Sequence, residues 1–169
     1  MSALLILGGA RSGKSRYGQA RIEGFAGPLT YIATAQAFDD EMAERIARHQ
    51  ADRGPRWRTV EAPLDLAEAI AAVRDGAVLV DCLTLWVSNL ILAERDCDAA
   101  GMALCAGLAD CRVPVALIAN EVGLGIVPDN ALARRFRDAA GWLNQRIAKT
   151  VDEVVFVAAG LPLVLKSGA

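Results

Sequence analysis

The sequence predicts an α/β fold with a mostly parallel central sheet of about six or seven strands and helices on both of its faces. Short apolar runs alternate with helical patterns along the chain, which is typical of strands connected by helices. Several runs, such as residues 77–80 and 115–118, show no polar alternation, as expected of central parallel strands that are covered on both sides. No repeat or linker interrupts the 169 residues, so we expect residues 1–169 to form a single domain.

The first predicted strand, residues 3–7, leads into a glycine-rich turn with the spacing G-x-x-x-x-G-K-S, and a helical pattern follows. This context predicts a phosphate-binding loop, and with it a phosphate-loop NTPase-like domain; the alternative is a glycine-rich turn that binds nothing. Backbone N–H groups and the dipole of the next helix would hold the phosphate. Lys14 is predicted to reach the β- and γ-phosphates, and the Ser15 hydroxyl to bind Mg²⁺. The predicted loop residues are Gly8, Gly9, Ala10, Arg11, Ser12, Gly13, Lys14 and Ser15.

The remaining elements follow in order along the chain. Strands are predicted near residues 29–33, 58–61, 77–81, 115–119 and 153–158, with residues 163–165 as a candidate last strand. Helices are expected between them, and residues 94–111 have the least clear pattern. One stripe of apolar residues with helical spacing is assigned to the core. Its members are Leu132, Phe136, Leu143 and Ile147.

Two acidic residues are expected at the carboxyl ends of strands, where ligands bind in parallel sheets. Asp81 ends the run at 77–81 and is a candidate Mg²⁺ ligand, directly or through water, with a strand-ending turn residue as the alternative. Glu121 follows the run at 115–119. It is a candidate partner of a metal-bound water or a substrate hydroxyl, or else a capping or turn residue.

The segment from 39 to 58 contains His49, the only histidine of the chain. His49 continues an apolar stripe with helical spacing, and Arg45 and Arg53 stand four residues before and after it. Arginines favour a neutral imidazole and can grip a polyphosphate. A neutral imidazole can attack a phosphorus atom and carry a covalent nucleotidyl group. From this pattern alone, a packed or solvent-edge histidine is the default interpretation.

Composition narrows the class of partner. The net charge of −2 means that the chain lacks the excess of positive charge by which proteins bind nucleic acid or an anionic membrane. No apolar run reaches the ~18 residues of a membrane span, and a loop at 8–15 leaves no room for a signal sequence, so a cytoplasmic protein is expected. The four cysteines lack C-x-x-C spacing and a neighbouring histidine. They are expected to be buried hydrophobes or surface thiols rather than zinc ligands.

Five stretches form a narrowly distributed combination: GGARSGKSR at 8–16, YIATAQ at 31–36, DDEMAERIARHQADR at 39–53, WRTVEAP at 57–63 and NEVGLGIVPDNALARRFRDAAGWLNQRIA at 120–148. The phosphate loop occurs in many enzymes, whereas the histidine helix followed by WRT and NEVG-x-GIVP is specific. With these stretches, nearly the whole chain resembles the bifunctional enzymes that are adenosylcobinamide kinase and adenosylcobinamide-phosphate guanylyltransferase in one polypeptide.

The resemblance implies that His49 forms a guanylyl-histidine intermediate, and it implies a homotrimer. Two departures matter. Asp81 stands where relatives can carry Glu, which shortens the reach of the carboxylate. The 94–111 segment looks shorter and richer in alanine, so contacts to the corrinoid cannot be transferred there. Besides the loop at 8–15, the residues that the resemblance places around GTP are Ala33, Thr34, Ala35, Gln50, Ala51, Asp52, Arg53, Glu61 and Asp81.

Residues and resemblance together predict a two-step enzyme of adenosylcobalamin biosynthesis. In the first step, ATP or GTP with Mg²⁺ phosphorylates the aminopropanol hydroxyl of adenosylcobinamide, while Lys14 and loop amides stabilise the transferred group. In the second step, GMP passes from GTP through His49 to adenosylcobinamide phosphate, and the product is adenosylcobinamide-GDP.

Three other classes of protein are weighed against this prediction. A GTPase switch would carry N-K-x-D after a strand, but the corresponding place reads Ala119-Asn120-Glu121-Val122, which counts against a switch. A simple small-molecule kinase needs the loop, Asp81 and an arginine-rich lid, which residues 8–15 and 45–58 can supply without covalent chemistry. A nucleotide-binding regulator without turnover is compatible with the same residues.

Overall fold

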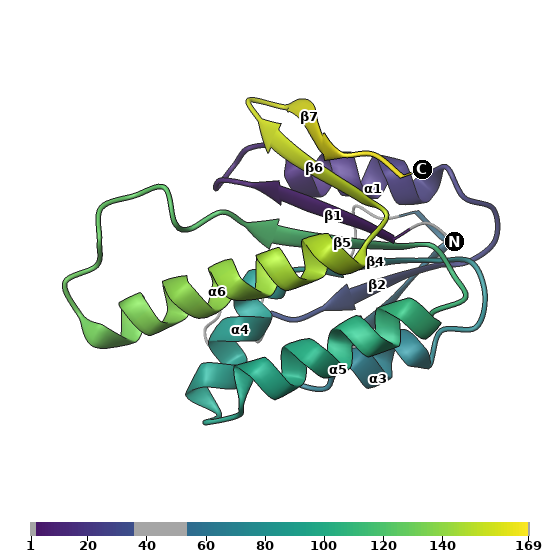
Figure 1. Ribbon diagram of the computed structural model, residues 1–169. Coiled ribbons are helices and arrows are strands. Elements are labelled where there is room, and N and C mark those ends of the chain that lie inside the picture. Colours follow the sequence, from purple (N-terminus) through teal and green to yellow (C-terminus); the bar gives the residue numbers. More distant parts are fainter. Residues whose placement is uncertain (1–2, 36–53, 169) are drawn as a thin grey trace.

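The computed structural model describes residues 3–35 and 54–168, and Figure 1 shows one twisted sheet with helices on both faces. The strand order across the sheet is β3-β2-β4-β5-β1-β6-β7. All neighbouring strands are parallel except β7, which pairs antiparallel with β6. The predicted α/β class and mostly parallel sheet are therefore confirmed. The strands are β1 (Ala3–Gly8), β2 (Leu29–Ala33), β3 (Trp57–Glu61), β4 (Ala77–Asp81), β5 (Val115–Asn120), β6 (Glu153–Ala158) and β7 (Leu161–Lys166).

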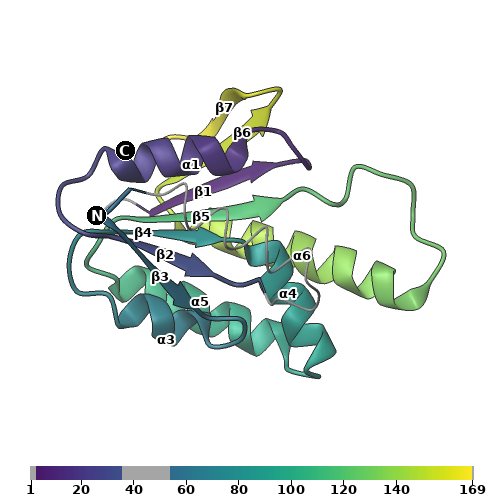
Figure 2. The same cartoon turned by 180° about the vertical axis from the view of Figure 1, so that it is seen from behind.

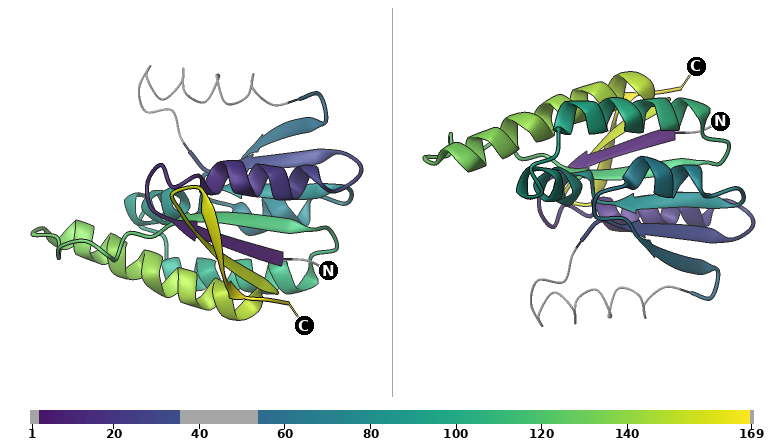
Figure 3. Two further views of the ribbon diagram at one scale, coloured as in Figure 1. Left: turned by 90° about the horizontal axis from the view of Figure 1, so that it is seen from above. Right: turned by 90° about the horizontal axis from the view of Figure 1, so that it is seen from below.

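The described helices divide unequally between the two faces. Helix α1 lies on one side of the sheet, and α3 and α5 lie on the other, as both Figure 1 and the view from behind in Figure 2 show. From above, α1 lies over the strands, and from below α5 and α6 cross them (Figure 3). The helices are α1 (Lys14–Glu23), α3 (Leu66–Ala71), α4 (Leu83–Leu92), α5 (Cys97–Asp110) and α6 (Ala131–Thr150).

Alternate residues of the central strands enter two separate core layers. On β1, Leu5 belongs to the layer under α3–α6, whereas Leu4 and Ile6 belong to the layer under α1. The larger layer contains Trp86 of α4, which is 2% exposed and whose indole Nε1 donates to the Leu64 carbonyl at 2.7 Å. Both faces of the sheet are thus packed, and ligands of such sheets bind beyond the carboxyl ends of the strands.

The stretch with the least clear sequence pattern contains α5. A carboxylate oxygen of Asp96 accepts hydrogen bonds from the N–H groups of Asp98 and Ala99 at 2.8 and 3.0 Å, which starts the helix with a side-chain cap. A Cβ on Gly101 would lie 3.2 Å from Leu143 Cδ1. Small residues therefore let α5 approach α6 closely, which explains why this stretch is poor in large apolar residues.

The core assignment for the stripe on α6 is partly wrong. Leu143 and Ile147 are buried and Phe136 is half-buried, but Leu132 is 55% exposed. The N-terminal part of this 20-residue helix projects beyond the strands, as Figure 1 shows, so its first turn has no sheet beneath it. Spacing identified the inward face of the helix but not the point at which the sheet ends.

Candidate nucleotide-binding site

The glycine-rich turn connects β1 to α1 as the sequence predicted. Strand β1 ends at Gly8, and α1 begins at Lys14 after Gly13, whose φ is 95°. The N-cap residue of α1 is Gly13, which has no side chain with which to cap the first turn. The N–H groups of this turn therefore stay available to an anion, and the helix dipole favours negative charge at the same place.

Two glycines of the loop are required by close backbone packing. A Cβ on Gly8 would lie 2.5 Å from both the Ser12 hydroxyl oxygen and the Val157 carbonyl oxygen. A Cβ on Gly13 would lie 3.1 Å from the Cα of Gly160, and the positive φ of Gly13 disfavours any side chain. These positions hold the loop against β6 and the turn that follows it.

The side chain of Lys14 folds back over the loop. It is 8% exposed, and its Nζ donates a hydrogen bond to the Gly9 carbonyl at 3.2 Å. A buried ammonium group is costly unless opposite charge accompanies it. The remaining N–H donors of Lys14 are suited to the phosphate oxygens that the sequence motif predicts.

Helix α1 approaches the sheet through Gly18. A Cβ at this position would lie 3.0 Å from Ile6 Cδ1, 3.1 Å from Leu79 Cδ1 and 3.3 Å from Ile118 Cδ1. These three side chains therefore lie on the α1 side of β1, β4 and β5. Because strand residues two apart share a face, the residues two positions further along each strand also face α1. Those residues are Gly8, Asp81 and Asn120.

Three of the predicted nucleotide contacts lie next to each other across strands. Ala33 is the register partner of Glu61 on β3 and of Asp81 on β4. Ala33 is buried, Glu61 is exposed and Asp81 is half-buried, and all three stand at carboxyl ends of strands. The structure thus brings these predicted residues to the same edge of the sheet as the loop at 8–15.

Thr34 connects β2 to the residue after β4. Its hydroxyl donates to the Cys82 carbonyl at 2.7 Å and accepts from the Cys82 N–H at 2.8 Å. Its own carbonyl accepts from Asn89 Nδ2 at 2.7 Å. Thr34 is 0% exposed, so these contacts give it a structural role in holding strand ends together. Ala35 follows it and is half-buried.

Burial also governs the chemistry of Cys82. Removal from solvent, and next the nearby charge of Asp81, raise the pKa of the thiol above its usual value. The thiol of Cys82 is therefore neutral at pH 7 and acts as a small hydrophobe, as predicted. The other three cysteines are half-buried and, like Cys82, form no disulfide.

The donor set fits Mg²⁺. Ser15 offers an exposed hydroxyl on the first turn of α1, and Asp81 offers a carboxylate on the same side of the sheet. Within residues 3–35 and 54–168, no three or more His, Cys, Asp and Glu side chains gather into a metal site. Mg²⁺ commonly takes one or two protein oxygens and completes its shell with phosphates and water, so a hydroxyl and one carboxylate suffice.

Part of the predicted site lies outside the described residues. This part contains the predicted nucleophile His49 and the neighbouring predicted contacts Gln50, Ala51, Asp52 and Arg53. Their roles stay predictions.

The sequence missed a contact to the loop from the far end of the chain. The β6–β7 hairpin turns through Ala159 and Gly160, whose φ values are 51° and 79°. Gly160 N–H donates to the Ser12 carbonyl at 2.8 Å. Gly160 is visible in the sequence as a turn residue, but no local signal shows that this turn packs on residues 8–15.

Glu121 has a turn contact in the structure. One of its carboxylate oxygens accepts from the Gly123 N–H at 2.5 Å, and its own N–H donates to the Gly8 carbonyl at 3.1 Å. Of the two roles considered from the sequence, this geometry favours the turn residue.

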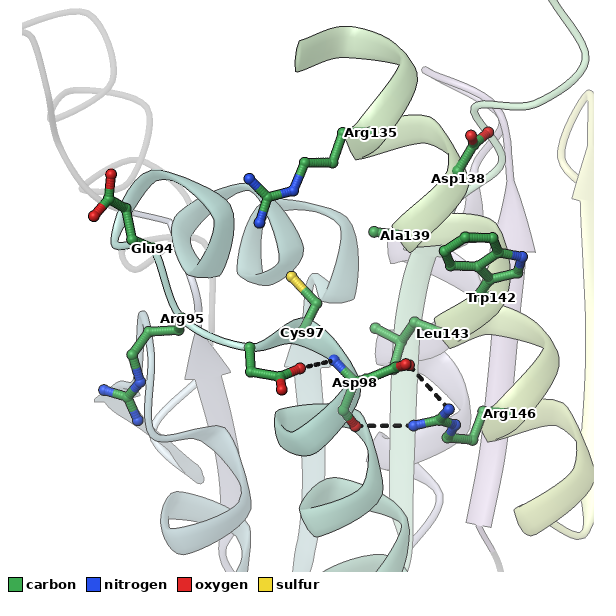
Figure 4. A pocket seen from close by; sticks show the side chains of 11 residues that line it. Glu94, Arg95, Cys97, Asp98, Arg135, Asp138, Ala139, Trp142, Leu143 and Arg146 are labelled. Carbon is green, nitrogen blue, oxygen red and sulfur yellow. Dashed lines mark hydrogen bonds and ion pairs between the residues drawn. The ribbon is translucent and has the colours of Figure 1, made fainter. Parts of the chain in front are cut away.

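A cavity of about 450 Å³ lies elsewhere, between the α4–α5 connection and α6. Figure 4 shows Arg135, Trp142 and Arg146 reaching towards it from α6 and Cys97 from α5. Arg146 Nη2 is held at 3.0 Å from a carboxylate oxygen of Asp98. Of the predicted nucleotide-site residues that the structure describes, none lines this cavity.

The loop, its uncapped helix and the acidic strand end define a phosphate-loop nucleotide-binding protein. A family model described as cobinamide kinase / cobinamide phosphate guanyltransferase matches residues 4–165. The chain therefore belongs to this family and is a cobinamide kinase and cobinamide phosphate guanylyltransferase.

Two relatives match along almost their whole length. The bifunctional adenosylcobalamin biosynthesis protein CobP of Pseudomonas aeruginosa is 47% identical over 166 residues, which cover 96% of each chain. The bifunctional adenosylcobalamin biosynthesis protein CobU of Salmonella typhimurium is 44% identical over 180 residues, covering 96% of this chain and 99% of its own. A solved structure from Pyrococcus horikoshii OT3, 7% identical, superposes with a TM-score of 0.53 over 98% of this chain and 86% of its own, which supports the fold alone. Among the described helices, none is long and apolar enough to cross a bilayer.

Proposed function

We propose that the enzyme acts in adenosylcobalamin biosynthesis by two successive transfers at phosphorus. In the first, the aminopropanol hydroxyl of adenosylcobinamide attacks the γ-phosphorus of ATP or GTP. A new P–O ester bond forms, the bond to the β,γ-bridging oxygen breaks, and a nucleoside diphosphate and a proton leave. The observation that carries this proposal is the buried Lys14, which lies over the loop at the N-terminus of α1, where the N-cap residue provides no side-chain cap.

The second transfer uses GTP and His49. An imidazole nitrogen attacks the α-phosphorus, a P–N bond forms and pyrophosphate leaves. A phosphate oxygen of adenosylcobinamide phosphate then attacks the same phosphorus, the P–N bond breaks, and adenosylcobinamide-GDP is released. The covalent intermediate allows pyrophosphate to depart before the bulky corrinoid must be positioned. Support comes from the family match and from the arginines at 45 and 53 beside the histidine.

Loop residues and strand ends have separate roles in this scheme. Lys14 and the N–H groups after Gly13 stabilise negative charge on the phosphates. Ser15 and Asp81 would hold Mg²⁺, which would neutralise negative charge on the phosphates. The predicted nucleotide contact at Ala33 lies between Asp81 and Glu61 across the strand ends. The family resemblance further supports a homotrimer and a location in the cytoplasm. Light scattering of the purified protein tests the oligomeric state by measuring its mass.

Label transfer tests the covalent step. The protein is incubated with Mg²⁺, pyrophosphatase and GTP labelled at the α- or the γ-phosphate, and protein-bound label is measured after denaturation. We expect α-label to be bound in an acid-labile, alkali-stable bond, and γ-label not to be bound. The His49→Ala variant should form no adduct but should still transfer γ-label to adenosylcobinamide.

The kinase reaction of His49→Ala is the internal control, because it shows that the variant folds and binds nucleotide. An adduct that persists in this variant would show that another residue is the nucleophile. Absence of any adduct in the unaltered protein, with phosphorylation intact, would leave a kinase alone.

A further inference from the structure

Two buried polar atoms in the described part of the chain lack a hydrogen-bond partner, and both flank the same glycine. They are the Ser12 hydroxyl oxygen and Asn120 Oδ1. Buried polar groups are nearly always paired, so each exception needs an explanation. Ser12 is 9% exposed, and its oxygen would lie 2.5 Å from a Cβ on Gly8. Asn120 is the register partner of Gly8 on the neighbouring strand.

Backbone hydrogen bonds hold Asn120 in place at the end of β5. Its N–H donates to the Thr84 hydroxyl at 2.6 Å, and the next N–H, that of Glu121, donates to the Gly8 carbonyl at 3.1 Å. The side chain of Asn120 lies on the α1 side of the sheet, as Ile118 does two residues before it. The carboxamide therefore faces the phosphate loop from a rigid support.

A second buried asparagine, Asn89, shows the hydrogen bonds that a carboxamide with a structural role forms. Asn89 Nδ2 donates to the carbonyls of Thr34 at 2.7 Å and Pro63 at 3.1 Å, and the residue is 6% exposed. Asn120 Oδ1, by contrast, is fully enclosed and has no hydrogen-bond partner among the described residues. The side chain of Asn120 thus does not serve the packing of the strand end.

We propose that Asn120 recognises the terminal phosphate of the bound nucleoside triphosphate, an inference that rests on the proposed function. A carboxamide carries two N–H donors and one acceptor without net charge. Nδ2 donates to an oxygen of the terminal phosphate, and Oδ1 accepts the hydroxyl hydrogen of Ser12 when the loop closes on its ligand. One Ser12–Asn120 hydrogen bond satisfies both unpartnered atoms and turns the amide nitrogen towards the phosphate.

In this assignment, Asn120 contributes to the binding of a nucleoside triphosphate but not to the binding of a nucleoside diphosphate. A nucleoside diphosphate lacks the group that Asn120 contacts, whereas it retains the contacts to the loop N–H groups and Lys14. Replacing the carboxamide by a carboxylate brings two negative charges together only in the triphosphate complex. Discrimination between the two nucleotides is therefore the property that isolates this residue.

The test compares the affinities of GDP and of the β,γ-imido analogue of GTP by titration calorimetry with Mg²⁺. It uses the full-length protein with His49→Ala, so that no covalent adduct forms. We expect Asn120→Asp to raise the Kd of the triphosphate analogue at least ten-fold and to change the Kd of GDP less than two-fold. Asn120→Ala should also raise the Kd of the triphosphate analogue, by a smaller factor, and leave the Kd of GDP unchanged. In protein that retains His49, Asn120→Ala should lower the kcat of phosphorylation.

Asn144→Asp on α6 is the matched control, because it introduces the same charge at a half-buried asparagine outside the site. It should leave both affinities unchanged. Equal shifts of both affinities in Asn120→Asp, or no shift in either, would overturn the assignment while leaving the proposed function intact. Failure of the His49→Ala protein to bind either nucleotide would overturn both.

Discussion

At the scale of single residues, the site depends as much on missing side chains as on present ones. Gly8 leaves the space that the Ser12 hydroxyl and the Val157 carbonyl occupy. Lys14 then folds over the loop towards Gly9. Sequence spacing predicted that glycine is needed in this turn, and the structure gives the reason for Gly8 and for Gly13.

The first prediction concerns Gly8→Ala. A methyl group 2.5 Å from the Val157 carbonyl oxygen cannot be accommodated without moving the backbone. We expect the free energy of unfolding to fall by about 1–3 kcal/mol and the affinity for nucleoside triphosphate to fall with it. Urea denaturation measures the first effect.

Gly9→Ala is the control for stability, because a Cβ at Gly9 meets no atom within 4 Å. Its free energy of unfolding should stay within about 0.5 kcal/mol of the unaltered protein. Equal stability of the two variants would contradict the steric explanation.

At the scale of elements, the carboxyl edge is held together by side chains that bond to backbone between strands. Thr34 joins the end of β2 to Cys82 after β4, and Thr84 joins the start of α4 to Asn120 at the end of β5. Backbone hydrogen bonds between strands stop where the strands end. Beyond that point, threonine hydroxyl groups form the hydrogen bonds that connect neighbouring segments. The geometry of Asp81 and Asn120 depends on these bridges.

Thr34→Val tests the first bridge. The substitution keeps the shape of the side chain but leaves the buried N–H and carbonyl of Cys82 without the hydroxyl. We expect a loss of about 1–3 kcal/mol in the free energy of unfolding. Thr30→Val, on the same strand and equally buried, removes a bond only to the exposed Arg58 and should cost less. A ranking in the opposite order in urea denaturation would refute this account.

At the scale of the whole molecule, an ion pair joins α1 to β6. The Arg21 guanidinium donates to both carboxylate oxygens of Glu153, at 2.9 and 2.7 Å, and to the Tyr17 hydroxyl. Hydrogen bonding to Arg21 lowers the pKa of Glu153 below its ordinary value. The pair contributes to the anchoring of the C-terminal end of α1, the helix that begins at the phosphate loop.

The sign of the pH effect follows from that lowered pKa. The stabilisation is fully present above the unfolded-state pKa of Glu153, near 4.5, and is lost as the pH falls through the lower folded-state value. We expect Glu153→Gln to lose about 1 kcal/mol at pH 7, since both side chains are partly exposed. The difference from the unaltered protein should shrink below pH 4. Asp138→Asn removes the partner of Arg137, and because the Asp138 carboxylate is more exposed than that of Glu153, it should show a smaller effect in the same denaturation series.

Features that depend on local chemistry could be predicted from the amino-acid sequence alone. These are the apolar runs that became strands, the spacing of residues 8–15, and the acidic residue at the end of β4, because each needs only neighbours along the chain. The bounds of the first six strands agree with prediction to within one residue, and the last strand, predicted at 163–165, is Leu161–Lys166.

Contacts between segments that are distant in the chain became visible only in the three-dimensional fold. It placed the Gly160 turn against Ser12, set Asn120 beside Gly8, and left Leu132 exposed where α6 outruns the sheet. Strand order and the end of a sheet are set by packing between residues far apart in the chain. Local sequence patterns therefore do not predict the strand order or the point at which the sheet ends.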